Sequence, residues 1–496
     1  MTIPPKYLFP MNVFFIASEA SPLAKTGGLA DVIGALPQAL HAYKHKLTVI
    51  MPYYRQIIDA TDVNITPIKK SISIWADGIN RNCPIHQLHL AGVTFLLVEQ
   101  DDLYNRKGLY GTTDSEYEDN FLRFVLFNRV ALELAAQSSE NVDILHCHDW
   151  QTGLIPLLLR SQYGHFPKLG QTKTVFTIHN LAYQGIFPAE WMRRMGIPTQ
   201  HFHHDGFEFY GQINCMKAGI MMADAITTVS ETYAKEILTP EYGCHLDGFL
   251  IRHQSKLSGI VNGIDINVWD PANDPLIPHT FSTKNIAGKK KCKLALQAFC
   301  GFPLSESTPL LTLISRLAEQ KGIGLLLPNI EAWMNRGMQL VILGSGDPDI
   351  EKSLKKFATK YPDNLFFMSD FNEPLAHKIY AGGDIFLMPS LFEPCGLGQL
   401  IAMRYGNVPV VRSTGGLCDT VTDYNVSKKQ ATGVHFSNAT AKALNDAVNE
   451  TITLFQKPAV WSRIRNNALR RDSSWDRSAL LYARLYTDLI KPKNLG

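Results

Sequence analysis

The stretch MNVFFIASEASPLAKTGGLADVIGALPQAL, residues 11–40, joins a short apolar run to a turn with two adjacent glycines and then to a helical pattern. The apolar run has the length of a strand, and helical spacing begins after Gly28 and lasts until Pro37. Gly27 therefore lies where a helix begins, and the free N–H groups there favour an anion such as phosphate. Lys25 adds a positive charge. The turn matches neither the P-loop nor the dinucleotide motif, so taken alone it also fits an ordinary loop.

Composition narrows the class of protein. A chain of 496 residues exceeds one ordinary core and predicts two or three domains. With 19% charged residues and a net charge of only +3, it is not expected to bind nucleic acid or a membrane surface, while small anionic ligands stay open. The eight cysteines show no zinc spacing, so we expect reduced, mostly buried thiols and a cytoplasmic protein.

The same pattern of strand and helix occurs twice. Residues 1 to about 250 contain the strand-length runs VTFLLVEQ, VDILHCHD, KTVFTIHN and AITTVS. After a polar stretch around 270–292 the pattern restarts with PLLTLISR, QLVILGSG, NLFFMSDF, DIFLMPS and VPVVRS. Runs that are apolar nearly throughout are typical of parallel strands covered on both faces. We therefore predict an α/β protein with two Rossmann-like, doubly wound domains facing a central cleft.

Polar side chains and glycines collect directly after these runs, where parallel sheets bind ligands. Arg316 and Lys321 follow one run of the second half, and Thr414 opens a second Thr-Gly-Gly turn. Two glycine turns and three basic residues suit a diphosphate. The residues singled out at these strand ends are Asp149, His179, Asn180, Gln184, Arg316, Lys321, Gly344, Gly346, Glu393, Thr414, Gly415 and Gly416.

An ordered set of motifs resembles a known family. The strings are SEASPLAKTGGLADV, HCHDWQTGLIP, TIHNLAYQGIF, FYGQINCMKAGIMMADAITTVS, LSGIVNGID, SRLAEQKG, LGSGDP, PSLFEPCGLGQLIAMRYG and TGGLCDTV. In this order they are similar to the bacterial glycogen synthases and plant starch synthases, which are retaining glycosyltransferases of the GT-B type. The resemblance runs from about residue 11 to about 488. Residues 1–10 precede the family's usual start, so a start at Met1 and one at Met11 both stay open.

The resemblance implies where the domains lie. The first, residues 1–252, is expected to bind the glucan and to be completed by a C-terminal helix within 472–496. The second, residues 253–471, is expected to hold the nucleotide-sugar donor. Oligomeric state cannot be inferred from the sequence.

The resemblance also implies roles for individual residues. Arg316 and Lys321 match the residues that bind the diphosphate, and Lys25 with its two glycines approaches it from the other wall. Glu393 matches the glutamate that contacts the transferred glucose, and His179 matches the histidine beside the reacting sugar. The substrate-binding positions that the resemblance and the strand ends together indicate are Gly27, Gly28, Asp149, Asn180, Gln184, Gly344, Gly346, Cys395, Gly396, Leu397, Thr414, Gly415 and Gly416.

The implied reaction transfers glucose from ADP-glucose to the non-reducing 4-hydroxyl end of glycogen or a malto-oligosaccharide, with retention of configuration and with no cofactor or metal. Positive groups and amide dipoles would stabilise the departing diphosphate. The sequence does not identify a carboxylate nucleophile of the kind retaining glycosidases use. We therefore favour attack by the acceptor from the same face, with the departing phosphate as base.

Other functions fit parts of the same sequence pattern. A retaining transferase that uses UDP-glucose or makes a different glucoside is an enzyme alternative, and donor competition separates the two. A catalytically silent glucan-binding homologue is expected to have lost some of the charged residues, all of which are present. A dehydrogenase would need the spaced-glycine motif, which follows neither first strand.

No functional role is expected for two further clusters of residues. His146 and His148 are expected to point to opposite faces of a strand, which disfavours a metal pair between them. The run GKKKCK at 288–293 is expected to be a charged helix face.

Overall fold

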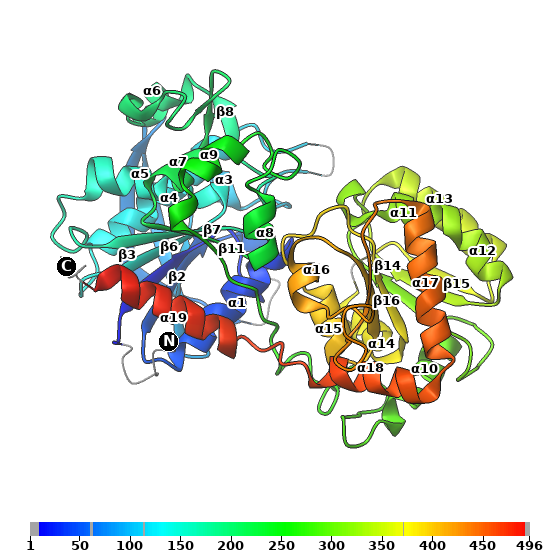
Figure 1. The fold of residues 1–496 in the computed structure, drawn as a ribbon. Coiled ribbons are helices and arrows are strands. Elements are labelled where there is room, and N and C mark those ends of the chain that lie inside the picture. The colour runs from blue at the N-terminus through cyan, green and yellow to red at the C-terminus, as the bar shows by residue number, and fades with distance from the viewer. Residues whose placement is uncertain (1–8, 60–62, 113–114, 371, 492–496) are drawn as a thin grey trace, which may run out of the picture. The chain divides into compact units, whose positions relative to one another are not determined.

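The computed structural model describes residues 9–59, 63–112, 115–370 and 372–491 and divides into two compact units (Figure 1). Unit 1 comprises the chain through Asn262 together with the residues from Trp475 on, and unit 2 is Gly263–Ser474. The boundary between the units therefore lies after Asn262, ten residues later than the predicted boundary after residue 252. The reason is that β12 (Leu257–Gly259) pairs in parallel with β11 (Ala225–Thr228) and so belongs to the sheet of unit 1. The return to unit 1 likewise comes at Trp475 and not at 472.

Unit 1 is built on a nine-stranded sheet with the order β12-β11-β7-β6-β1-β2-β5-β4-β3. Its parallel strands run outward from β1 in both directions, which is the strand order of a doubly wound sheet. Besides β11 and β12, the strands are β1 (Asn12–Ile16), β2 (Lys46–Pro52), β3 (Thr66–Ala76), β4 (Ile79–Leu90), β5 (Val93–Val98), β6 (Ile144–His148) and β7 (Lys173–Ile178). A small antiparallel sheet contains β8 (Ile186–Pro188), β9 (Glu208–Phe209) and β10 (Gln212–Asn214).

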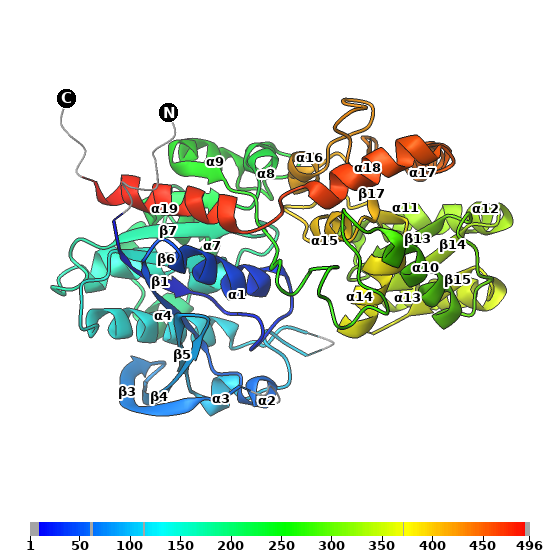
Figure 2. The same ribbon diagram turned by 90° about the horizontal axis from the view of Figure 1, so that it is seen from below.

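The central parallel strands of this sheet and its antiparallel edge strands differ in burial. All five residues of β1 are buried, as expected for a central strand with helices on both faces. The hairpin β3–β4 pairs antiparallel with β5 at one edge of the sheet (Figure 2), and the end of β3 alternates between buried and exposed residues. The sequence analysis does not predict this hairpin.

The helices of unit 1 include one from the C-terminal end of the chain. Helix α19 (Asp476–Ile490) packs against α1 (Gly28–His41) within unit 1 and buries Tyr482 and Tyr486 completely (Figure 1). The other helices are α2 (Arg55–Ile58), α3 (Asp101–Tyr104), α4 (Asn120–Ala136), α5 (Ile155–Leu158), α6 (Trp191–Met195), α7 (Cys215–Met222), α8 (Glu231–Glu236) and α9 (Asp247–Arg252).

Unit 2 contains a six-stranded sheet, all parallel, with the order β15-β14-β13-β16-β17-β18. The chain order is again doubly wound, and the direction of winding reverses between β13 and β16. The strands are β13 (Leu310–Ile314), β14 (Gln339–Leu343), β15 (Leu365–Met368), β16 (Ile385–Met388), β17 (Val408–Arg412) and β18 (Val434–Phe436).

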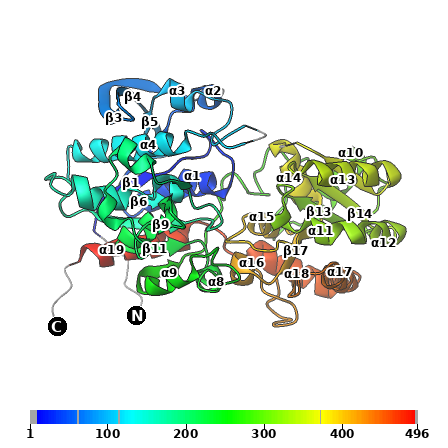
Figure 3. The same cartoon turned by 90° about the horizontal axis from the view of Figure 1, so that it is seen from above.

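Helices cover both faces of this sheet (Figure 3), and alternate strand residues enter two separate cores. Leu340 and Ile342 of β14 belong to one core, whereas Val341 and Leu343 belong to the other. The helices are α10 (Ala287–Phe299), α11 (Ile323–Leu326), α12 (Ile330–Asn335), α13 (Pro348–Lys360), α14 (Glu373–Gly382), α15 (Gly398–Arg404), α16 (Gly415–Thr420), α17 (Ala441–Phe455) and α18 (Pro458–Arg470).

The interpretation of residues 288–293 as a charged helix face is only partly right. Lys289 and Lys293 of α10 are buried, and the ammonium group of Lys289 donates to the carbonyl oxygens of Ala381 and Gly383 at 2.9 and 2.8 Å. A lysine can be buried where carbonyl oxygens accept its hydrogen bonds. Lys289 therefore ties α10 to the end of α14, and Lys293 ties it to Asp384, the residue before β16, through a 2.7 Å ion pair.

Candidate active site

The reversal of winding brings particular loops together at the carboxyl edge of each sheet. In unit 1 the reversal lies between β1 and β6, which are paired, and in unit 2 between β13 and β16. Open α/β sheets bind ligands at such points because the two adjacent loops leave in opposite directions. The predicted residues of each unit are described separately below.

The turn after β1 is organised by Glu19, which is 3% exposed. Its carboxylate accepts hydrogen bonds from the backbone N–H of Thr26 at 2.5 Å, the Thr26 hydroxyl at 2.7 Å and the Tyr110 hydroxyl at 2.6 Å. The N–H of Gly27 also donates to it, at 3.3 Å. The sequence analysis assigned Gly27 and Gly28 to a phosphate, but the N–H of Gly27 is already bonded to this internal carboxylate, and Glu19 was not singled out.

Lys25 lies on the exposed side of the same turn. Its ammonium group is 2.6 Å from the carboxylate of Asp31 in the first turn of α1, and its side chain is 41% exposed. Such an exposed ion pair contributes little to stability. Lys25 is therefore accessible to an anionic ligand that replaces Asp31 as its partner.

Asp149 follows β6 directly and has an unusual backbone conformation, with φ of 56°. Its carboxylate accepts the backbone N–H of His179 at 2.7 Å, which joins the end of β6 to the end of β7. Burial raises the pKa of Asp149 to about 7, although hydrogen bonds from the His179 and Asn180 backbones oppose the rise. Residues held at positive φ are concentrated at functional sites, where the surrounding structure maintains the strain.

His179 follows β7 and contacts a second histidine. Its Nε2 lies 3.0 Å from Nδ1 of His148, and burial lowers its pKa to about 3. The expectation that His146 and His148 point to opposite faces is wrong, because their ring centroids are 4.1 Å apart. Residues two apart in a strand share a face.

Asn180 and Gln184 lie in the loop after β7. The side-chain oxygen of Asn180 accepts from the N–H of Ala182 at 3.1 Å. The amide of Gln184 donates to the Cys244 carbonyl at 2.9 Å and accepts from the Asn214 side chain at 2.6 Å. Gln184 thus fixes this loop to the rest of unit 1, so the structure gives it a role in shaping the site that the sequence analysis did not foresee.

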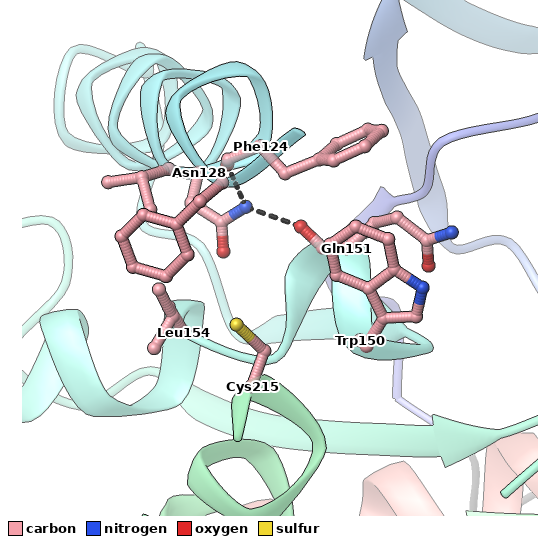
Figure 4. A pocket seen from close by; sticks show the side chains of 8 residues that line it. Phe124, Asn128, Trp150, Gln151, Leu154 and Cys215 are labelled. Carbon is pink, nitrogen blue, oxygen red and sulfur yellow. Dashed lines mark hydrogen bonds between the residues drawn. The ribbon is translucent and has the colours of Figure 1, made fainter. Parts of the chain in front are cut away.

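A small pocket lies between α4, the turn after β6 and the start of α7 (Figure 4). It is lined mainly by apolar side chains, among them Phe124, Trp150 and Leu154. Asn128 donates to the carbonyl oxygens of Phe124 and Gln151. None of the predicted site residues lines this pocket.

In unit 2 an ion pair joins the two loops at the reversal of winding. Lys321, after β13, lies 2.6 Å from the carboxylate of Glu393, after β16, with side-chain exposures of 17% and 7%. The Ser390 hydroxyl donates to the same carboxylate oxygen at 3.0 Å. Arg316, two residues after β13, is exposed, and its guanidinium group forms no hydrogen bond or ion pair with a described residue, while its carbonyl oxygen accepts from the Ser315 hydroxyl at 3.1 Å. This edge therefore presents one cation without an anionic partner, Arg316, and one that is paired, Lys321.

The predicted glycines of unit 2 allow backbone segments to approach closely. A Cβ on Gly344 would lie 1.8 Å from the carbonyl oxygen of Ser315, and one on Gly346 would lie 2.4 Å from that of Leu317. These close approaches hold the loop after β14 against the loop that carries Arg316.

The Thr414-Gly-Gly turn packs against the segment after Glu393. Gly415 has a φ of +45°, and a Cβ there would lie 2.0 Å from the Glu393 carbonyl oxygen. The N–H of Gly416 donates to the carbonyl oxygens of Glu393 and Pro394, both at 3.1 Å. The N–H of Gly416, one of the predicted substrate-binding positions, thus has acceptors within the protein.

Cys395, Gly396 and Leu397 connect Glu393 to α15. Gln399 donates from its side chain to the carbonyl oxygens of Cys395 and Gly396, at 3.0 and 2.9 Å. Cys395 is buried, which agrees with a packing role for this thiol. All eight cysteines lie within the described residues, and six of them are buried.

The described residues contain neither a metal-binding cluster nor a membrane-spanning helix. Within the described ranges no three His, Cys, Asp or Glu side chains are grouped so that they could hold a metal ion. No helix in those same ranges has the length and apolarity needed to cross a bilayer.

Comparison with known proteins identifies both units. Residues 12–252 match the model of the starch synthase catalytic domain, and residues 301–467 match that of the glycosyl transferases group 1. Glycogen synthase 2 of Geobacter sulfurreducens is 45% identical over 476 residues, which cover 96% of this chain and 98% of that protein. Glycogen synthase of Anaeromyxobacter dehalogenans is 44% identical over 482 residues, 97% of this chain and all of that protein.

Solved structures of two other proteins are also similar to this chain. The catalytic domain of starch synthase IV from Arabidopsis thaliana, solved with ADP and acarbose, superposes on this chain with a TM-score of 0.91 and is 34% identical in sequence. The match covers 97% of this chain and all of the starch synthase chain. Sucrose-phosphate synthase from Thermosynechococcus elongatus is 17% identical with a TM-score of 0.59 and shares the fold.

Two doubly wound units, each matched by a glycosyltransferase model, define a glycosyltransferase of the GT-B fold. The chain belongs to the glycogen synthase and starch synthase family. The fold, the family and the class of reaction predicted from the sequence are thereby confirmed.

Proposed function

We propose that this protein elongates a 1,4-α-glucan by transferring glucose from ADP-glucose to the non-reducing 4-hydroxyl end with retention of configuration. The observation that carries the proposal is the match over 97% of the chain to a starch synthase solved with ADP and acarbose. ADP supplies a diphosphate, and acarbose is a sugar chain. The full-length likeness to glycogen synthases supports a glucan as the acceptor.

The diphosphate is assigned to the carboxyl edge of unit 2. Arg316 is exposed and unpaired among the described residues, and Lys321 lies close by with Glu393 as its partner. Guanidinium and ammonium groups are the usual partners of phosphate oxygens. When the bond from glucose C1 to the diphosphate oxygen breaks, negative charge grows on the leaving group and these cations stabilise it.

Glu393 is assigned to the transferred glucose. Its carboxylate is buried and held by Lys321 and Ser390, so it keeps a fixed position with little freedom to move toward the sugar carbon. A fixed carboxylate suits hydrogen bonds to sugar hydroxyl groups and favours positive charge on the ring. We therefore propose that the acceptor hydroxyl attacks from the face the diphosphate leaves, with a phosphate oxygen taking its proton.

The residues of unit 1 are assigned to the sugar and the acceptor. His179, Asp149 and Asn180 meet at the ends of β6 and β7 through the 2.7 Å hydrogen bond from His179 to Asp149. Lys25 is the accessible cation that unit 1 offers to an anionic ligand. We propose that no metal and no other cofactor is required, because these cations supply the charge that a metal would supply. We also propose a cytoplasmic location, which fits cysteines that are mostly buried in the interior as in a reducing compartment.

The test is glucan elongation by the purified protein with glycogen as primer. Radiolabelled ADP-glucose and UDP-glucose are supplied in parallel, each with and without EDTA. We expect incorporation mainly from ADP-glucose and no effect of EDTA. Preference for UDP-glucose, or loss with EDTA that Mg²⁺ restores, would contradict the donor or the metal independence respectively. No incorporation by folded protein would favour the silent homologue.

A further inference from the structure

Three histidines lie in contact behind the strand ends of unit 1. His146 and His148 are on β6, and His179 follows β7. The ring centroids of His146 and His148 are 4.1 Å apart, and those of His148 and His179 are 5.2 Å apart. His148 is also stacked on Phe15 of β1, at 5.7 Å between centroids and 15° between planes. The reading of the sequence gave a role only to His179.

The nitrogens of the inner two rings have different partners. Nδ1 of His146 lies 2.7 Å from the Tyr486 hydroxyl, and Nε2 lies 2.6 Å from the Thr177 hydroxyl. In His148, Nδ1 lies 3.0 Å from Nε2 of His179. Nε2 of His148 is buried and has no hydrogen-bond partner among the described residues. The His148 ring thus has a single hydrogen-bond partner among the described residues, the ring of His179.

Burial lowers the pKa of all three histidines, so the rings of His148 and His179 are both neutral at neutral pH. Two neutral imidazoles can share one hydrogen bond in two ways, since exactly one of the facing nitrogens carries a proton. If His179 donated from Nε2, then His148 would carry its proton on Nε2, where a buried N–H would have no acceptor. If His148 donates from Nδ1, then only a lone pair is left unpartnered at Nε2.

A buried N–H without an acceptor is rarer in folded proteins than a buried acceptor without a donor. The second arrangement is therefore the favoured one. It leaves His179 with its proton on Nδ1, the nitrogen that no described residue engages.

We propose that His148 is a positioning residue that donates its Nδ1–H to His179 and thereby holds His179 as the tautomer protonated at Nδ1. His179 then offers a neutral hydrogen-bond donor to an oxygen of its ligand and is not a base. The identity of that ligand as a sugar rests on the proposed function. A neutral donor places no positive charge beside a sugar ring that itself becomes positive during transfer.

The tautomer is measured directly by NMR of the full-length protein labelled with ¹⁵N-histidine. A protonated ring nitrogen and an unprotonated one have well-separated ¹⁵N shifts, and the His179→Gln variant assigns the signals. We expect the proton of His179 on Nδ1, and we expect the His148→Asp variant, which presents an acceptor, to move it to Nε2. A proton on Nε2 of His179 in the wild type would overturn the proposal. This readout does not depend on the activity.

Turnover supplies the second readout. Asn can place an amide N–H near the position of Nδ1, so His148→Asn is expected to keep kcat within about twofold, whereas His148→Leu lowers kcat about tenfold, as for one lost hydrogen bond. KM for donor and glucan is expected to change less than kcat.

His45 provides a matched control. It is also buried, its Nδ1 accepts from the Met11 N–H at 3.2 Å, and its Nε2 is also unpartnered among described residues, but it precedes β2 at the opposite edge of the sheet. His45→Leu is expected to lower the melting temperature without lowering kcat. If His148→Leu and His45→Leu had the same kcat, then His148 would be only structural. A wild type that elongates no glucan would contradict the proposed function and leave the NMR result to decide this inference.

Discussion

The ammonium group of Lys321 lies 2.6 Å from the carboxylate of Glu393, although the two residues are 72 positions apart in the chain. Lys321 follows β13 and Glu393 follows β16, the paired strands at which the winding of unit 2 reverses. The pair therefore places a cation and a carboxylate in contact at the carboxyl edge of this sheet, where the proposed function assigns the leaving group and the transferred sugar.

Removing the cations should slow the chemical step. Arg316→Ala, Lys321→Ala and Lys25→Ala are each expected to lower kcat roughly 100-fold or more, which corresponds to about 3 kcal/mol of transition-state stabilisation. Steady-state kinetics with ADP-glucose and glycogen measure this. Lys360→Ala is the control, because its 2.6 Å ion pair with Glu331 is exposed on the surface of unit 2. A kcat of Arg316→Ala equal to that of the control would remove the assigned role.

Glu19→Gln should loosen the turn that carries Lys25. The carboxylate accepts from two backbone N–H groups and two hydroxyls, and the amide would present N–H groups to some of these donors. We expect a loss of about 2 kcal/mol in the free energy of unfolding and a lower kcat, because hydrogen bonds to a charged group are stronger than neutral ones. Tyr110→Phe, which removes one donor, should cost less. Urea denaturation measures the free energy of unfolding of both variants. An equal loss in the two variants would contradict the central role of the Glu19 carboxylate.

The stability of the protein should depend on the ionisation of Asp149. Its pKa is raised from 3.8 to about 7 in the folded state, so the folded protein binds this proton more tightly than the unfolded chain does. The resulting stabilisation is complete below about pH 4 and is lost as the pH rises through 7, and it amounts to at most about 4 kcal/mol. The free energy of unfolding of the wild type minus that of Asp149→Asn should therefore fall between pH 4 and pH 8. A difference that stays constant would show that folding does not raise the pKa of Asp149.

Gly415→Ala should disturb the segment that carries Glu393. Gly301→Ala is a matched control, because Gly301 also has a positive φ but no atom within 4 Å of an added Cβ. Both substitutions place an alanine at a positive φ, which costs about 1 kcal/mol, and only Gly415→Ala adds a clash with the Glu393 carbonyl oxygen. We expect a larger loss of melting temperature and a lower kcat for Gly415→Ala alone. Equal behaviour would mean that the turn tolerates the extra atom.

The sequence predicts the fold and the strand-end residues for a definite reason. Parallel strands buried on both faces appear as continuous apolar runs, as β1 and β14 do, and residues directly after such runs must lie at one edge of the sheet. Asp149, His179, Arg316 and Glu393 are found in this way. The hairpin β3–β4 has no such run, since its end alternates between buried and exposed residues.

The interactions between these residues are not available from the sequence. Glu19 acts on Thr26 across a turn and on Tyr110 across 91 positions, so its partners depend on the folded sheet. The contact of His148 with His179 depends in the same way on the register of β6 against β7. The burial of Lys289 depends on the carbonyl groups of Ala381 and Gly383, at the end of α14, which accept its hydrogen bonds. In each case the position could be noticed in the sequence, but the partner could not.

The measurement that tests the central claim most directly is the elongation of maltoheptaose labelled at its reducing end, with ADP-glucose as donor and the wild-type protein in EDTA. The account predicts a ladder of labelled products, each longer by one glucose, that an enzyme specific for α-1,4 linkages degrades completely. Products that resist this enzyme, or an unchanged primer with folded protein, would contradict the account.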